Sequence, residues 1–177
     1  MKEISYGEMF LFISIIWLSV RILCWLMQGK IYIKRELQLL FVYICLVVVA
    51  RFTYFPMLRV GGRLQPLVFD PALAWPFRIN FLPFVYLFDY PVLSAALLNI
   101  IGNTAMFMPL GIVWPAVYKK LDKAWKVISA GVGVSLFIEL SQLPFYDRVS
   151  DIDDLILNSL GFIMGFGIYL LWKRRRA

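Results

Sequence analysis

Long apolar runs determine which class of fold this chain can adopt. Five stretches of about twenty residues contain mostly apolar side chains. The core of a bilayer offers no water to the backbone, so a chain that crosses it forms helices or a closed barrel. The runs are continuous rather than alternating, which favours helices. With 62% hydrophobic and 16% charged residues, we predict an all-α, polytopic membrane protein with a single domain over 1–177.

The spans can be placed by the residues that interrupt the runs. We expect them at about 7–28, 37–55, 92–118, 127–143 and 151–172. The first has no small-residue cleavage site and is predicted to be an uncleaved helix; in an alternative with four spans it lies on the membrane surface. Pro109 and Pro115 predict a kink in the third span.

The longest connection, residues 56–92, is predicted to lie at the membrane interface. Six prolines and the pair Gly61-Gly62 interrupt it, so no spanning helix fits. It is also too aromatic and aliphatic for a solvated loop. We therefore predict an interfacial or re-entrant segment in the headgroup layer.

Basic residues predict the orientation of the spans. Eleven of the 18 lysines and arginines fall on one side of a five-span arrangement: Lys30, Lys34, Arg35, Lys119, Lys120, Lys123, Lys126, Lys173, Arg174, Arg175 and Arg176. The positive-inside rule makes that side cytoplasmic, with the N-terminus outside and the C-terminus inside. Arg21, near the inner end of its span, is expected to snorkel to the headgroups. The net charge of +7 thus reflects topology rather than a nucleic-acid partner.

The absence of histidine narrows the chemistry. It excludes His-based general bases, His-dependent nucleophilic triads and His-ligated metal sites. Cys24 and Cys45 lie singly in apolar spans and are interpreted as small buried hydrophobes rather than a disulfide or metal pair.

Polar residues inside the apolar runs are the functional candidates, because charged and amide groups are costly in a membrane. Residues 135–161 carry five carboxylates. Helical spacing groups the polar residues into three stripes: Ser135, Glu139 and Gln142; Asp151, Asp154, Asn158, Gly161 and Gly165; and Asn99, Gly102 and Asn103. All three stripes fall in the outer half of the bilayer, so we predict a shared polar pocket that opens outwards. Its candidate binding residues are Asn99, Asn103, Glu139, Gln142, Arg148, Asp151, Asp154 and Asn158.

Several of these residues also have purely structural interpretations. Amides inside membrane helices often join helices, and the G-x-x-x-G spacing of Gly161 and Gly165 permits close packing. Glu139 is harder to explain in this way, since a charged carboxylate costs about 2.5–3.5 kcal/mol on insertion scales. It is either neutral or close to a cation. Arg51 and Arg148 are the candidate counter-ions, and for Arg51 snorkelling is an equal alternative.

The loop before the last span has local signals of its own. Pro144 is expected to stop the fourth helix, and Ser150 with Asp153 predicts a capping box, with Ser150 as N-cap. Asp151 and Asp154 are explained less well by capping. They are candidates for holding a divalent cation such as Mg²⁺ or Ca²⁺, an amine or a lipid headgroup.

Four segments resemble the VanZ-like family of bacterial membrane proteins: R-I-N-F-L-P-F (78–84), N-I-I-G-N-T-A-M-F-M-P-L-G (99–111), I-E-L-S-Q (138–142) and R-V-S-D-I-D-D-L-I-L-N-S-L-G (148–161). The resemblance covers about residues 78–165. Asp147 departs from it, since relatives often have a glycine before the arginine. The resemblance implies a bacterial envelope protein and, by analogy with the founding member, a contribution to resistance to the glycopeptide teicoplanin.

Three functions are compatible with these residues. The leading hypothesis is a non-catalytic envelope protein whose outward pocket binds a lipid headgroup, a cell-wall intermediate or a glycopeptide. The alternative is an intramembrane enzyme that uses carboxylates or a divalent cation on a lipid-linked substrate, although the sequence offers no nucleophile motif. Small-solute transport ranks third, because the polar residues concentrate in one half of the membrane.

Overall fold

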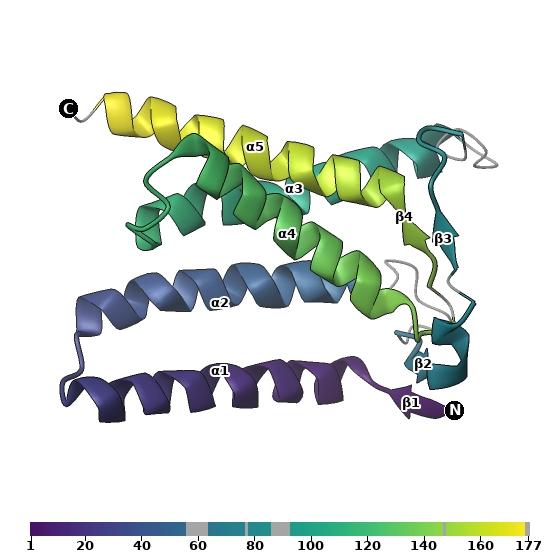
Figure 1. The fold of residues 1–177 in the computed structure, drawn as a ribbon, viewed down its shortest axis with the longest axis horizontal. Helices are drawn as coiled ribbons and strands as arrows, with labels where there is room; N and C mark the ends of the chain where they lie inside the picture. Colours follow the sequence, from purple (N-terminus) through teal and green to yellow (C-terminus); the bar gives the residue numbers. More distant parts are fainter. Residues whose placement is uncertain (56–63, 77, 86–92, 147, 176–177) are drawn as a thin grey trace.

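Five long helices form the molecule. The computed structural model describes residues 1–55, 64–76, 78–85, 93–146 and 148–175. Within these residues, five helices are long and apolar enough to cross a membrane, and they run along the long axis of the molecule (Figure 1). They are α1 (Tyr6–Gln28), α2 (Ile33–Tyr54), α3 (Leu93–Val117), α4 (Ala124–Gln142) and α5 (Ile152–Arg174). The prediction of an all-α, five-span membrane protein is confirmed.

The first two helices are joined more tightly than predicted. α2 begins at Ile33 rather than near residue 37, and Gly29 closes α1 in the left-handed conformation at φ 64°. The earlier start places Glu36 within α2, where its Oε2 accepts a hydrogen bond of 2.9 Å from Arg21 Nε. The guanidinium of Arg21 is thus paired with a carboxylate of the neighbouring helix, a partner that the sequence analysis did not predict, and its reach to the headgroups stays a prediction.

The centre of the bundle is the contact between α3 and α5. A Cβ atom on Gly161 would lie 1.9 Å from the carbonyl oxygen of Thr104, and one on Gly165 would lie 2.1 Å from that of Met108. The two backbones thus touch at these glycines, as small residues allow in membrane helices. α3 continues as a helix through Pro109 and Pro115. Around this contact lies the main apolar core, which includes Cys45, Phe107, Leu110, Val127, Ile138 and Phe162.

Short strands connect the helices at one end of the bundle. β1 (Lys2–Ile4) pairs antiparallel with β2 (Leu67–Phe69), and β3 (Ile79–Asn80) pairs parallel with β4 (Ser150–Asp151). A 3-10 turn, η1 (Pro71–Ala74), lies between β2 and β3. The β3–β4 pair fastens the connection between α2 and α3 to the start of α5. The predicted interfacial segment falls partly on residues 56–63, 77 and 86–92, which lie outside the described residues, and its place in a bilayer stays a prediction.

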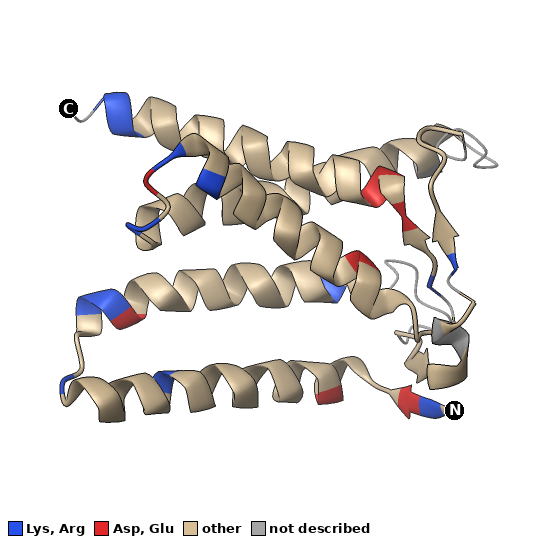
Figure 2. Ribbon diagram, in the orientation of Figure 1, with Lys and Arg blue, Asp and Glu red and all other residues tan. Residues whose placement is uncertain are grey.

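Charges separate between the two ends of the bundle (Figure 2). Lysines and arginines gather at the end that carries the α1–α2 connection, the α3–α4 connection and the C-terminus. Most of the aspartates and glutamates of the described chain lie toward the opposite end, where the N-terminus and the strands are found. The candidate functional residues belong to this acidic end.

Candidate functional site

The first part of the site joins α3 to α5. Asn103 Nδ2 donates to Asp154 Oδ1 at 2.5 Å and to Asn99 Oδ1 at 3.3 Å. Asn99 and Asn103 are one helical turn apart on the same face of α3, and the Asn103 amide reaches the first turn of α5. These three side chains remain partly exposed. Two of the three predicted stripes therefore meet at this carboxylate.

The second part joins α4 to the start of α5. Glu139 Oε2 accepts the backbone N–H of Asp151 at 2.9 Å, and Asn158 Nδ2 donates to Ser135 Oγ at 3.1 Å. Glu139 is 3% exposed and Asn158 is 1% exposed. The α5 stripe that the sequence groups together is thus divided: Asp154 and the two glycines face α3, whereas Asn158 faces α4. α5 packs against both helices, and a single stripe serves two contacts.

Two candidates point to α2 instead. Gln142 Nε2 donates to the carbonyl oxygen of Thr53 at 2.7 Å, and Arg148 Nη2 donates to that of Tyr54 at 2.7 Å. The last carbonyls of a helix have no partner within the helix and need donors from elsewhere. Gln142 and Arg148 supply such donors, which ties the α4–α5 connection to the end of α2.

Arg51, one of the two candidate counter-ions of Glu139, makes other contacts in the structure. Arg51 Nη1 donates to the carbonyl oxygen of Phe55 at 2.9 Å. Its guanidinium also lies 5.7 Å from the ring centre of Tyr6 and 5.3 Å from that of Phe52. Arg51 thus closes its own helix and contacts aromatic faces, which attract a cation.

The predicted capping box is wrong by one residue. Asp151, not Ser150, is the N-cap of α5, and its Oδ1 accepts the backbone N–H of Asp153 at 2.9 Å. Ser150 lies in β4, where its N–H donates to the carbonyl oxygen of Arg78 at 3.1 Å. Strand pairing keeps Ser150 extended, so the helix starts later. Asp153 instead accepts the N–H of Phe84 at 2.8 Å.

Two residues that the sequence analysis did not name as candidates complete the site. Asn80 Nδ2 donates to Asp151 Oδ1 at 3.1 Å, while its own Oδ1 accepts the N–H of Leu82 at 3.1 Å. Arg78 donates to the carbonyl oxygens of Phe145 and Tyr146 at 2.5 and 2.8 Å. Both lie in the R-I-N-F-L-P-F segment, one of the four segments that carry the family resemblance. Spacing could not show that β3 brings this segment next to α5.

The hydrogen-bond partners of Asp151 and Asp154 are relevant to the divalent cation predicted at these carboxylates. No group of three acidic or cysteine residues is placed to hold a metal ion within the described parts of the chain. One oxygen each of Asp151 and Asp154 accepts hydrogen from a side-chain amide. Asp147 lies outside the described residues. A divalent cation at Asp151 and Asp154 stays a prediction.

Exposure separates the cluster into an inner and an outer layer. Glu139, Gln142, Asp153 and Asn158 are buried and bind backbone or neighbouring side chains. The outer layer consists of the partly exposed side chains Asn99, Asn103, Arg148, Asp151 and Asp154. Three apolar side chains that follow Asn80 in the sequence are also exposed: Phe81 by 72%, Leu82 by 56% and Phe84 by 52%. The arrangement presents hydrogen-bond acceptors beside apolar surface.

The fold and this site define a multi-pass α-helical membrane protein with a polar cluster at one end of its bundle. The family model for VanZ/LLP1 matches residues 40–173, and the chain belongs to this family. The match includes the whole cluster and begins within α2. No curated protein and no solved structure matches the chain.

Proposed function

We propose that this protein lies in the bacterial cytoplasmic membrane with its N-terminus outside, and that the outer layer of the cluster binds an amphipathic envelope ligand. The ligand class comprises lipid headgroups, cell-wall intermediates and lipoglycopeptides, and binding it contributes to teicoplanin or lipoglycopeptide resistance. The observation that carries the proposal is the partly exposed Asn103–Asp154 pair at the acidic end of an apolar bundle.

The chemistry of the outer layer supports a ligand with a donor-rich head. Asp154 and Asp151 are hydrogen-bond acceptors, and a carboxylate in a partly dry site binds ammonium or hydroxyl donors more strongly than neutral acceptors do. The guanidinium groups of Arg78 and Arg148 donate to backbone carbonyls. The exposed side chains of Phe81 and Leu82 offer an apolar surface for a hydrocarbon chain.

The decisive variant is Asp154→Asn. An asparagine oxygen can still accept from Asn103, so the α3–α5 contact is retained while the charge is removed. We expect at least a roughly tenfold weaker binding of a fluorescent lipoglycopeptide to vesicles containing the protein. Teicoplanin susceptibility of cells with matched protein levels should rise in parallel.

Asp122→Asn is the matched control. Asp122 lies at the opposite end and pairs with Lys126 at 2.7 Å, so its loss removes the same charge without touching the cluster. Binding by this variant should equal that of the unaltered chain. Equal binding by Asp154→Asn, at equal protein level, would refute the proposed ligand site.

Orientation can be tested separately. Single cysteines replace Lys2 or Lys123, both exposed and at opposite ends, in a chain with Cys24 and Cys45 changed to alanine. A thiol reagent that cannot cross membranes should label the first in intact cells and the second only after permeabilisation. The reverse labelling would invert the proposed topology.

A further inference from the structure

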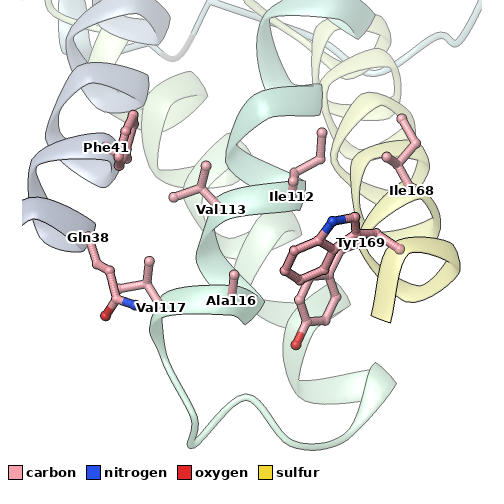
Figure 3. A pocket seen from close by; sticks show the side chains of 9 residues that line it. Gln38, Phe41, Ile112, Val113, Ala116, Val117, Ile168 and Tyr169 are labelled. Atoms are coloured by element: carbon pink, nitrogen blue, oxygen red, sulfur yellow. The ribbon is translucent and has the colours of Figure 1, made fainter. Parts of the chain in front are cut away.

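An apolar groove lies at the basic end of the bundle, far from the candidate functional site. Figure 3 shows side chains of α2, α3 and α5 around it, with the small side chain of Ala116 between the two outer helices. Its volume is about 310 Å³, and it is lined by Gln38, Phe41, Ile112, Val113, Ala116, Val117, Ile168, Tyr169 and Trp172. This groove has the chemistry of a site for a hydrocarbon chain.

A wider and strongly basic cavity continues from the groove. Its volume is about 840 Å³, and it is lined by Tyr32, Lys34, Arg35, Gln38, Ala116, Val117, Tyr118, Lys119 and Lys120. Gln38, Ala116 and Val117 line both spaces, so the two are contiguous. The lining contains four cations and no carboxylate. Because these positive side chains repel cations and attract anions, this cavity is suited to an anion.

Arg35 fixes one wall of this cavity. Its guanidinium donates to the carbonyl oxygen of Val117 at the end of α3 and lies 5.5 Å from the ring centre of Tyr118. These contacts hold the start of α2 against the end of α3. The basic wall is thus positioned before any ligand arrives, which lowers the cost of binding.

Carboxylates near this end already have partners. Glu36 binds Arg21, and Asp122 binds Lys126. In the described chain no ion pair involves Lys34, Lys119 or Lys120. Their charges therefore face the cavity or solvent without an internal counter-ion.

We propose that the basic cavity and the apolar groove together bind one anionic phospholipid of the adjoining leaflet. The phosphate lies between Lys34, Lys119 and Lys120, with the hydroxyls of Tyr32 and Tyr118 near the headgroup, and one acyl chain occupies the groove. Basic pockets between membrane helices bind anionic headgroups in this way. The site differs in place and in charge from the acidic cluster at the other end.

The test compares two lipids with identical acyl chains, phosphatidylglycerol and phosphatidylcholine, by native mass spectrometry of the protein in a neutral detergent. A cation near a membrane surface contributes roughly a factor of five to anion binding. We expect phosphatidylglycerol to bind at least about tenfold more tightly than phosphatidylcholine. Equal affinities would overturn the proposal.

Two triple variants separate the cavity from general charge. Lys34→Gln, Lys119→Gln and Lys120→Gln together should weaken phosphatidylglycerol binding at least about tenfold. The control triple Lys30→Gln, Lys123→Gln and Lys173→Gln removes the same charge from exposed positions at the same end. It should bind within about twofold of the unaltered chain, because screening weakens distant charges. An equal loss in both triples would overturn the proposed site.

The groove is tested by Ala116→Trp. Ala116 is exposed toward the groove, so the larger side chain fills the space without displacing the core. Phosphatidylglycerol binding should fall at least about tenfold, since the acyl chain loses its place. Unchanged binding would show that the groove does not hold the acyl chain. Displacement of the lipid by inorganic phosphate at equal concentration would show that a free anion suffices, and either result would overturn the lipid assignment.

Discussion

The α3–α5 pair and the α1–α2 pair use opposite means of association. α3 and α5 touch through their backbones at Gly161 and Gly165. α1 has no buried residue and is joined to α2 by side chains along one stripe. Ser14 Oγ and Tyr43 Oη lie 2.6 Å apart, and the ring centres of Trp17 and Tyr43 lie 5.5 Å apart. Arg21 pairs with Glu36.

This difference follows from the solvent. Lipid tails are as apolar as leucine, so two membrane helices gain little by burying apolar side chains against each other. Close packing at glycines and directional polar contacts are what remain. The first holds α3 to α5 over several turns and supports the candidate site. The second leaves α1 at the edge of the bundle, outside the part matched by the family model.

The largest expected effect on either helix pair comes from a substitution that disrupts the backbone contact between α3 and α5. Gly161→Leu places atoms where Thr104 has its carbonyl oxygen, and a rigid helix backbone cannot yield as a side chain would. We expect a loss of at least about 3 kcal/mol in the free energy of unfolding, measured by SDS titration in mixed micelles. Gly167→Leu, on the same helix with no atom within 4 Å, is the control and should unfold like the unaltered chain.

Substitutions of Glu139 are expected to have a smaller effect on the free energy of unfolding. They distinguish the role of Glu139 as a hydrogen-bond acceptor from the role of its charge. Glu139→Leu leaves the N–H of Asp151 without its partner, at a cost of about 1–3 kcal/mol in the free energy of unfolding. Glu139→Gln keeps an oxygen that accepts the same bond and should recover most of that loss. If Gln is as damaging as Leu in the same titration, the charge of Glu139 rather than its bond stabilises the fold.

The membrane spans and the polar faces of the helices could be predicted from the sequence. The five spans follow from apolar runs, since the bilayer leaves helices as the simple solution for them. The stripes containing Asn103, Asp154 and Glu139 were identified from helical spacing and take part in contacts between helices. The errors come from contacts between distant segments. β3 pairing shifted the cap of α5 from Ser150 to Asp151.

The sequence also could not predict which neighbour each polar side chain contacts. Helical spacing places a side chain on a face but not against a particular neighbour, and Arg51 and Arg21 show the consequence. Arg51 had a carboxylate within plausible reach yet binds a backbone carbonyl, whereas Arg21 was expected in the headgroups yet binds Glu36. The α5 stripe was read as one surface although two helices share it.

The polar attachment of α1 should be weaker than either contact above. Arg21→Gln removes the ion pair with Glu36, whose two side chains are only 13% and 21% exposed. We expect a loss of about 1 kcal/mol in the free energy of unfolding, in the range measured for polar contacts between membrane helices. The double variant Arg21→Gln with Glu36→Gln should recover part of the loss, since no unpaired carboxylate is left. An unchanged value for the single variant would show that Ser14 and Trp17 suffice to hold α1.

The smallest effect is expected on the outer face of α1. Phe12 and Leu23 are 65% and 58% exposed, so truncating either to alanine exchanges a contact with lipid for another contact with lipid. The free energy of unfolding should change by less than about 0.5 kcal/mol. Phe107→Ala, at a residue with no exposure in α3, should cost about 3–5 kcal/mol in the same titration. A loss at Phe12 that approaches the Phe107 value would mean that protein rather than lipid covers this face, and α1 would then be an interface instead of an edge.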